Sequence, residues 1–231
     1  MARRPTSNTR LRSATPEAGD AFLEKTLAVG SWAQNNRQAM ILIGIAVVGV
    51  LMGSLYYWSY RRQHLERAGV ELERVEQAAA FGDTATAKVE LTQYIESFGN
   101  TVYGDEARLL LGQIYLTSGQ TDQAVTLLEG AADLAKPIGV QVAILLGKAH
   151  EQKGDLKAAE ELFLRIADRS PLDFQVRSAL DDAARLRSKQ GNAAGAVELY
   201  QRILDKLAKT APERGGYEMR LQELKLKTQQ G

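Results

Sequence analysis

The chain has 231 residues, a formal net charge of +1 and no cysteine. The near-zero charge provides no general basic field, so a nucleic-acid partner is not expected. The lack of cysteine excludes disulfides, thiolate metal sites and thiol catalysis.

The residues before the first long apolar run divide into two parts. Residues 1–19 are rich in Arg, Ser, Thr and Pro and predict a disordered basic tail, because they have too few apolar groups to form a core. Residues 20–38 predict a juxtamembrane amphipathic segment, in which Phe22 and Leu27 follow Asp20 as a helix cap.

Residues 39–60 contain no charged side chain and predict a single transmembrane helix. About 20 helical residues span about 30 Å, the thickness of the hydrocarbon core of a bilayer. Aromatic residues and two arginines border the run on its C-terminal side, as expected where a helix leaves the membrane. The alternatives are a soluble core helix and a cleaved signal peptide. A signal peptide is disfavoured because the run is long, lies well inside the chain and has no cleavage site after it.

Charge near the apolar run leaves its orientation open. Within about 20 residues, Lys25 and Arg37 lie on the N-terminal side, and the excess of arginine on the other side favours a cytoplasmic C-terminal part. Those arginines are Arg61, Arg62, Arg67 and Arg74. Counted over the whole tail, six basic residues favour the opposite orientation slightly. Inside the run, Gly49 and Gly53 form a GxxxG pair, which predicts membrane-helix pairing in a homodimer.

A glycine recurs through the rest of the chain, at Gly82, Gly119, Gly154 and Gly191, at spacings of 37, 35 and 37 residues. Each is followed five residues later by an alanine: Ala87, Ala124, Ala159 and Ala196. Glycine tolerates positive φ where one helix ends, and alanine lets the next helix pack closely. Polar residues predicted to cap the second helices follow each glycine: Asp83-Thr84, Gln120-Thr121-Asp122, Asp155 and Asn192. The period predicts repeated helix pairs.

These repeats resemble the tetratricopeptide family. Residues 140–173 match its consensus through Leu146-Gly147, Gly154, Ala159, Phe163 and Pro171. Residues 105–138 are similar, with Pro137 one place late, and the units at 68–101 and 177–210 keep part of the pattern. A segment from Tyr217 to Lys227 predicts a capping helix. The expected fold is all-α: a transmembrane helix followed, in residues 61–231, by a tetratricopeptide-like α-solenoid of about four helix pairs.

The order of parts is also similar to that of the membrane-anchored ancillary subunits of the bacterial Sec translocon. The local matches are Trp32-Ala33-Gln34-Asn35-Asn36, Tyr57-Trp58, and Tyr103-Gly104 leading into Ala107, Leu109, Leu111 and Gln113. The resemblance implies a bacterial inner-membrane protein with periplasmic repeats. Its implied partners are translocon subunits and a chaperone or an exported chain. The alternative is a cytoplasmic-facing adaptor or assembly factor for another membrane complex.

No catalytic constellation is found, so neither an enzyme nor a metal or cofactor is expected. His150-Glu151 begins like the zinc motif HExxH, but Gly154 stands where the second histidine is required. Gly147-Lys148 lacks the leading glycine and the Ser or Thr of a phosphate loop. Core packing is expected for His150. Solvated helix surfaces are expected for two carboxylate pairs, Asp181-Asp182 and Glu160-Glu161.

A partner-binding face is predicted on the first helix of each pair, where solenoids present a concave surface. Its residues are Leu109, Gln113, Ile144, Lys148, Glu151, Asp181 and Arg185. The Lys/Asn set with which chaperone-binding relatives grip a C-terminal carboxylate is absent apart from Lys148. The mixture of charge and apolar side chains suits an extended or partly unfolded polypeptide. The expected partners are therefore proteins, together with the lipid bilayer through residues 39–60.

Overall fold

The computed structural model describes residues 36–81 and 83–230, and every regular element in them is an α-helix. The predicted all-α class is therefore confirmed. The predictions on residues 1–19, on residues 20–35 and on the turn at Gly82 lie outside the described residues. A boundary between two compact units falls after Arg62, and each unit is described by itself.

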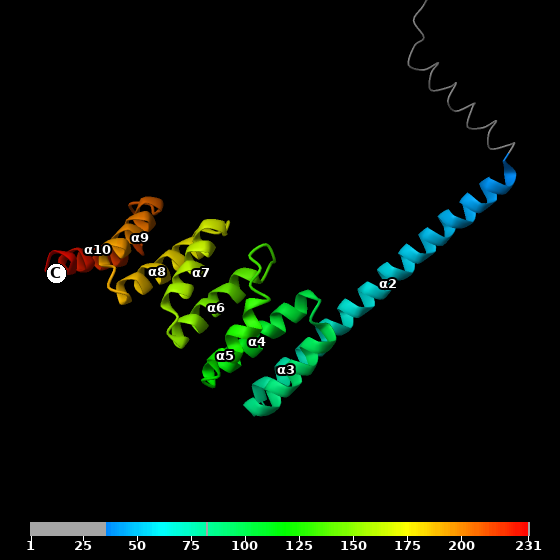
Figure 1. The fold of residues 1–231 in the computed structure, drawn as a ribbon, viewed down its shortest axis with the longest axis horizontal. Helices are drawn as coiled ribbons and strands as arrows, with labels where there is room; N and C mark the ends of the chain where they lie inside the picture. The colour runs from blue at the N-terminus through cyan, green and yellow to red at the C-terminus, as the bar shows by residue number, and fades with distance from the viewer. Residues whose placement is uncertain (1–35, 82, 231) are drawn as a thin grey trace, which may run out of the picture. The chain divides into compact units, whose positions relative to one another are not determined.

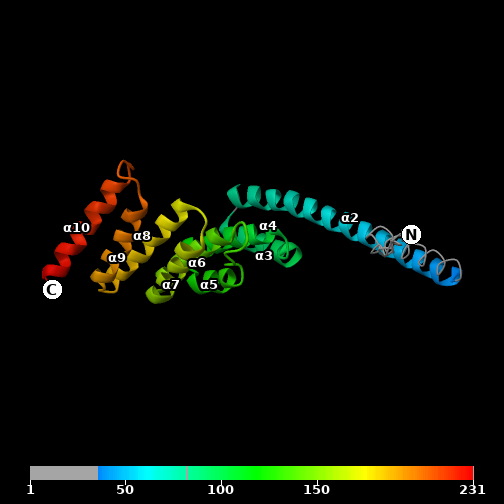
Figure 2. The ribbon, with the colours of Figure 1, turned by 90° about the horizontal axis from the view of Figure 1, so that it is seen from above.

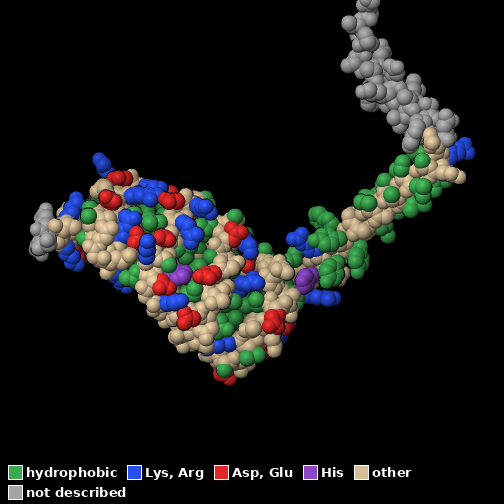
Figure 3. Space-filling view, viewed as in Figure 1, with side chains coloured by type: hydrophobic (Ala, Val, Ile, Leu, Met, Phe, Trp, Pro, Cys, Tyr) green, Lys and Arg blue, Asp and Glu red, His purple; other side chains and the backbone are tan. Residues whose placement is uncertain are grey.

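Helix α2 (Arg37–Phe81) is 45 residues long and contains the predicted apolar run. Its apolar part is long and apolar enough to cross a membrane, by length and composition, and none of it is buried. Figure 3 shows hydrophobic and uncharged atoms along this part of the helix, with Lys and Arg side chains at its ends. Within the described residues, α2 is the one helix that meets this test.

The unit from Gln63 onward consists of the end of α2 and eight further described helices. They are α3 (Thr84–Phe98), α4 (Val102–Thr117), α5 (Thr121–Glu129), α6 (Gly139–Lys153), α7 (Leu156–Arg169), α8 (Asp173–Lys189), α9 (Ala193–Lys206) and α10 (Arg214–Gln230). Successive helices form antiparallel pairs that stack in chain order (Figures 1 and 2). This arrangement is the predicted tetratricopeptide-like solenoid, with α10 as its last helix.

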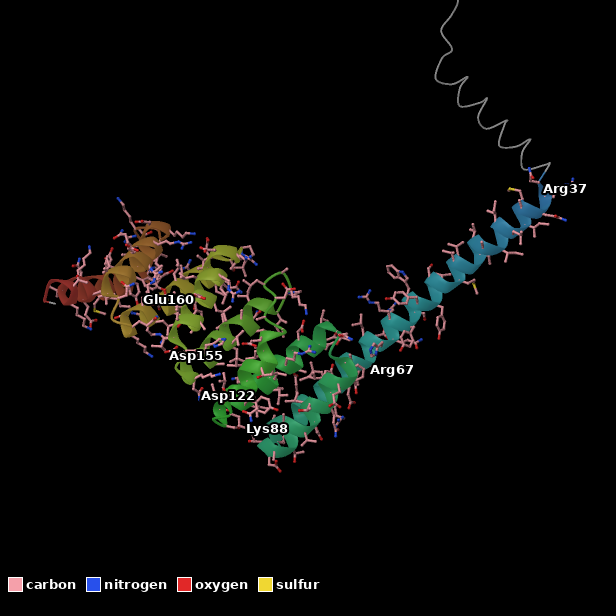
Figure 4. All side chains as sticks on the ribbon, in the orientation of Figure 1. Arg37, Arg67, Lys88, Asp122, Asp155 and Glu160 are labelled. Atoms are coloured by element: carbon pink, nitrogen blue, oxygen red, sulfur yellow. The ribbon has the colours of Figure 1, made fainter. Side chains whose placement is uncertain are left out.

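The glycine turns inside the pairs are confirmed where they are described. Gly119, Gly154 and Gly191 have φ of 72°, 93° and 81°, and no other described residue has a positive φ. L-residues with a Cβ avoid this conformation, so glycine is required where α4, α6 and α8 end. These turns define one edge of the unit, which we call the glycine edge, and Lys88, Asp122 and Asp155 lie along it in Figure 4.

The cap predictions are correct at two turns and wrong at two. The side chain of Asp83 accepts a hydrogen bond from the Thr86 amide at 2.7 Å, and Asn192 accepts one from the Gly195 amide at 2.8 Å. Gln120 and Asp155 make no such bond. The Asp155 amide instead donates to the carbonyl of His150 at 2.8 Å, so backbone bonds close the α6–α7 turn.

Close helix contacts inside each pair depend on small residues. The four predicted alanines of the second helices are buried, with at most 3% exposure. A Cβ at Gly147 of α6 would lie 2.7 Å from the Phe163 ring of α7, and one at Gly112 would lie 2.8 Å from Leu128. The glycines of the two Leu-Gly motifs therefore allow the bulky side chain of the second helix to approach the first.

The core of the unit from Gln63 onward consists of two clusters of buried side chains. One cluster of buried side chains joins α2, α3 and α4 around Leu72, Leu91 and Leu111, and a larger one extends from α5 to α10 around Phe163. Tyr115 packs against both clusters.

One helix pair, α4 and α5, departs from the pattern, because α5 has only nine residues and an irregular segment, residues 130–138, follows it. The late Pro137 lies in this segment.

Candidate functional site

The seven predicted face residues lie on the first helices of three successive pairs. Leu109 and Gln113 are on α4, and Asp181 and Arg185 are on α8. The other three, Ile144, Lys148 and Glu151, are on α6. These helices stack because α4 contacts α6 directly and ion pairs join α6 to α8.

Glu151 is the centre of an ion-pair cluster between α6 and α8. Its carboxylate accepts hydrogen bonds from both terminal nitrogens of Arg185, one of them at 2.8 Å, and from Nζ of Lys189 at 2.5 Å. The Arg185 guanidinium also donates to Oδ1 of Asp182 at 2.8 Å. A two-pronged Arg–carboxylate contact is among the strongest polar contacts available to a protein. The cluster therefore fixes α6 against α8.

Asp181 takes part in a second polar cluster, at the end of the solenoid. The Arg220 guanidinium of α10 donates to both carboxylate oxygens of Asp181, at 2.5 and 2.6 Å. The Tyr200 hydroxyl of α9 donates to Oδ1 of Asp181 at 3.0 Å. Burial, and then the Asp181 charge, raises the pKa of Tyr200 to about 12, so Tyr200 remains a neutral donor. One carboxylate thus links α8, α9 and α10.

The hydrogen bonds from Arg185 lower the pKa of Glu151 to about 2, and those from Lys189 add to this effect. The pKa of Arg185 is raised by the same contact. Both groups are therefore charged at any physiological pH, and each has its opposite charge already in place. A partner that used Glu151 or Arg185 for recognition would have to compete with this internal pair.

The remaining face residues have no such internal partner among the described residues. Gln113 and Lys148 are exposed, and their side chains make no hydrogen bond or ion pair. Leu109 and Ile144 are half-buried and pack against the larger core cluster with part of each side chain outward. We call these four residues the open half of the face, and Glu151, Asp181 and Arg185 the paired half.

One expectation about charged residues is corrected. The carboxylates predicted to be solvated are largely engaged, since Asp181 and Asp182 pair with arginines and Glu160 accepts a hydrogen bond from Nε of Arg187 at 2.6 Å. Among these four carboxylates, only Glu161 is exposed. The part that four residues take in these clusters was not predicted from the sequence: Asp182, Lys189, Tyr200 and Arg220. Lys189 follows Arg185 by four residues on one helix face, which was an available signal.

His150 is mostly buried at the end of α6, as expected for a core histidine. Its Nδ1 lies 3.8 Å from Oδ2 of Asp155 and makes no hydrogen bond. It lines a cavity of about 250 Å³ between α5 and α7, together with Glu129, Glu161 and Arg165. Across the described residues, no group of three or more His, Cys, Asp or Glu side chains could hold a metal ion.

A cavity of about 620 Å³ lies away from the predicted face, between residues 99–103 and residues 130–138. Its buried Asp105 pairs with Arg108 at 3.1 Å and with Lys136 at 2.8 Å. This charge is therefore balanced within the protein.

Gly44, Gly49 and Gly53 lie on the exposed apolar part of α2, and a Cβ at any of them would meet no atom within 4 Å. Pairing through this face stays a prediction.

Comparisons with known proteins agree with the helix-pair geometry. A family model described as a tetratricopeptide repeat-like domain matches residues 31–226. A Podosopora anserina putative kinesin light chain with nearly identical TPR-like repeats is 20% identical with a TM-score of 0.56, over 71% of this chain and 88% of that chain. A tetratricopeptide repeat protein from Parabacteroides merdae is 14% identical with a TM-score of 0.56, over 70% of this chain and 61% of that chain. At these identities, the likeness shows the fold alone. Comparison with curated proteins finds no match.

Proposed function

Because the chain belongs to the tetratricopeptide repeat-like domain family, we propose that it is a membrane-anchored scaffold that binds another protein on its first-helix face. The observation that carries this proposal is helix α2, which contains an exposed apolar span and continues into the repeats. A solenoid of this kind binds proteins through an extended surface rather than through a closed pocket.

The open half of the face is the proposed contact surface. Its charges and amides are free to bind a partner, whereas binding at Glu151 or Arg185 would break existing ion pairs. Leu109 and Ile144 offer apolar contact, while Gln113 and Lys148 can bond to a peptide backbone. This combination suits an extended or partly unfolded polypeptide.

A photo-crosslinking side chain at Gln113 should therefore form adducts with an unfolded model polypeptide. The matched control is Gln123 on α5, which is also exposed but lies on a second helix. Truncation of both Leu109 and Ile144 to alanine should lower the Gln113 yield, because it removes the apolar contact. Adducts from Gln123 and none from Gln113, with helical content unchanged in circular dichroism, would assign binding to the other face.

The more specific proposal is an accessory subunit of the bacterial Sec translocon that works with periplasmic chaperones on exported proteins. This proposal is supported by the resemblance to that family in the order of the parts of the chain and in the local matches Tyr57-Trp58 and Tyr103-Gly104. The second candidate, a cytoplasmic-facing adaptor or assembly factor, is favoured by the arginines that follow the apolar span, Arg61 and Arg62 among them. The two candidates place the repeats on opposite sides of the membrane.

Sidedness can be measured with a single cysteine, since the chain has none. Gln123→Cys is the preferred site because its side chain is exposed, whereas Gln120 is half-buried and accepts a hydrogen bond from Lys88. We expect a thiol reagent that cannot cross the inner membrane to label Gln123→Cys in intact cells. Labelling only after lysis would reject the translocon–chaperone proposal and favour the adaptor.

A further inference from the structure

The first helices of the solenoid carry their face residues in one register. On α6 and α8, two predicted face residues stand four places apart, as Ile144 and Lys148 and as Asp181 and Arg185. In both helices, the residue just before the first of them is buried, and so is the residue two places after it. These buried residues are Ala143 and Leu146 on α6, and Leu180 and Ala183 on α8. This spacing of buried residues therefore identifies the side of a first helix that belongs to the face.

Helix α10 has the same register. Its residues Leu221 and Leu224 are buried, at 5% and 6% exposure, and both belong to the larger core cluster. They place Gln222 and Leu226 at the two face positions of this helix, and Met219 lies about one turn before Gln222. An ion pair joins α8 to α10, as another joins α6 to α8. The first-helix face therefore continues onto α10.

The part of the face on α10 is apolar and exposed. Met219 is 71% exposed, and Leu226 is 59% exposed. They stand seven residues apart, which is about two helical turns, so their side chains project from the same side of α10. Gln222, also exposed, lies between them. The face thus has an apolar site at each end, with the open half on α4 and α6 at one end and the α10 residues at the other.

The charged middle of the face, between these two ends, is balanced. Its ion pairs contain as many cations as carboxylates: Glu151, Asp181 and Asp182 are matched by Arg185, Lys189 and Arg220. Paired charges in equal number produce little net field, so the middle selects for neither an acidic nor a basic segment. A ligand that crosses it is held by its ends.

We propose that the face binds one extended polypeptide segment through two apolar side chains, one at Leu109 on α4 and one between Met219 and Leu226 on α10. Packed helices lie about 10 Å apart, so the three steps from α4 to α10 cover about 30 Å. An extended chain rises about 3.3 Å per residue and alternates sides, which places the two side chains about eight or ten residues apart. Once the first side chain is bound, the second contact is intramolecular, so two weak contacts combine. The inference rests on the proposed function and specifies the ligand of the same face.

The test uses the full chain in lipid nanodiscs and synthetic peptides of serine and glutamine that carry two leucines. Peptides with the leucines about eight or ten residues apart are compared with one in which they are about four apart, and empty nanodiscs are the blank. A photo-crosslinking side chain is placed at Gln113 or at Gln222, both of which are exposed. We expect the widely spaced peptides to crosslink at both sites and to bind about tenfold more tightly than the closely spaced one.

Variants of the chain locate the second contact. Replacing Met219 and Leu226 together by serine should reduce the affinity for the widely spaced peptides to that for the closely spaced one. Val89→Ser, at an exposed valine on the second helix α3, should leave it unchanged. Equal affinities for both spacings, or crosslinks at Gln113 alone, would overturn the inference and leave the proposed function in place. No crosslink of any peptide at Gln113 or Gln222 would overturn both.

Discussion

Phe163→Ala should destabilise the repeat domain by about 3–5 kcal/mol, the usual cost of removing a fully buried aromatic ring. Phe163 is 0% exposed, and its ring fills the space left by Gly147 on α6. No neighbouring side chain can occupy that space without moving α6 towards α7. Urea unfolding of the purified chain, followed by circular dichroism, measures the change.

The matched control is Phe174→Ala, which removes the same side chain from a position that is 60% exposed. Its effect should stay within about 0.5 kcal/mol, as is usual at the surface. Because each pair in a solenoid is stabilised by its neighbours, Phe163→Ala should also broaden the transition, as the two ends of the array lose their coupling. Similar losses for both variants would mean that the ring of Phe163 is not packed as described.

The repeat fold could be predicted from the sequence because its strongest constraint is local. A positive φ at Gly119, Gly154 and Gly191 requires glycine wherever it occurs, so the period of the turns is visible in a single sequence. The short α5 could not be predicted in the same way. Residues 121–138 keep the apolar pattern of a full unit, yet the helix ends at Glu129, and the apolar residues that follow reach the core from an irregular segment.

The sequence indicated which helices hold the residues of the candidate site, but not which of their side chains form ion pairs. Alignment of the units placed Glu151 and Arg185 on equivalent surfaces, yet it gave no information on whether the two side chains meet. The ion-pair partner of Asp181 could not be predicted from the repeats at all, because Arg220 belongs to α10, and α10 does not follow the repeat pattern. Long side chains reach across helices, so ion pairs depend on helix rotation as well as on sequence spacing.

Glu151→Gln should lower the free energy of unfolding at neutral pH by about 1–2 kcal/mol. The depression of the Glu151 pKa from 4.5 to about 2 sets an upper limit of about 3 kcal/mol. Solvent screening reduces this value, because the side chains of Arg185 and Lys189 are 40% and 52% exposed. The variant keeps the shape of the side chain and removes its charge. Urea unfolding of both proteins measures the difference, with Glu161→Gln on the exposed surface of α7 as the matched control.

The pH dependence distinguishes an ion pair from simple packing. The unfolded chain binds a proton at Glu151 more readily than the folded chain does, so the stabilisation is fully present above pH 4.5. It should decline as the pH falls below that value and disappear near pH 2, which makes wild type and Glu151→Gln converge. A difference that stayed constant from about pH 7 to about pH 3 would contradict the ion-pair account.

The same variant also tests the division of the binding face. If a partner binds the open half, Glu151→Gln should leave the crosslinking yield at Gln113 unchanged under conditions where the variant is folded. If recognition instead uses the charges of the paired half, the yield should change in step with the loss of the Glu151 charge. Glu151 would then have to leave Arg185 and Lys189 to reach a partner, at the cost of two contacts that hold α6 against α8. The internal pairing therefore favours a structural role for Glu151, with recognition by its neighbours on α4 and α6.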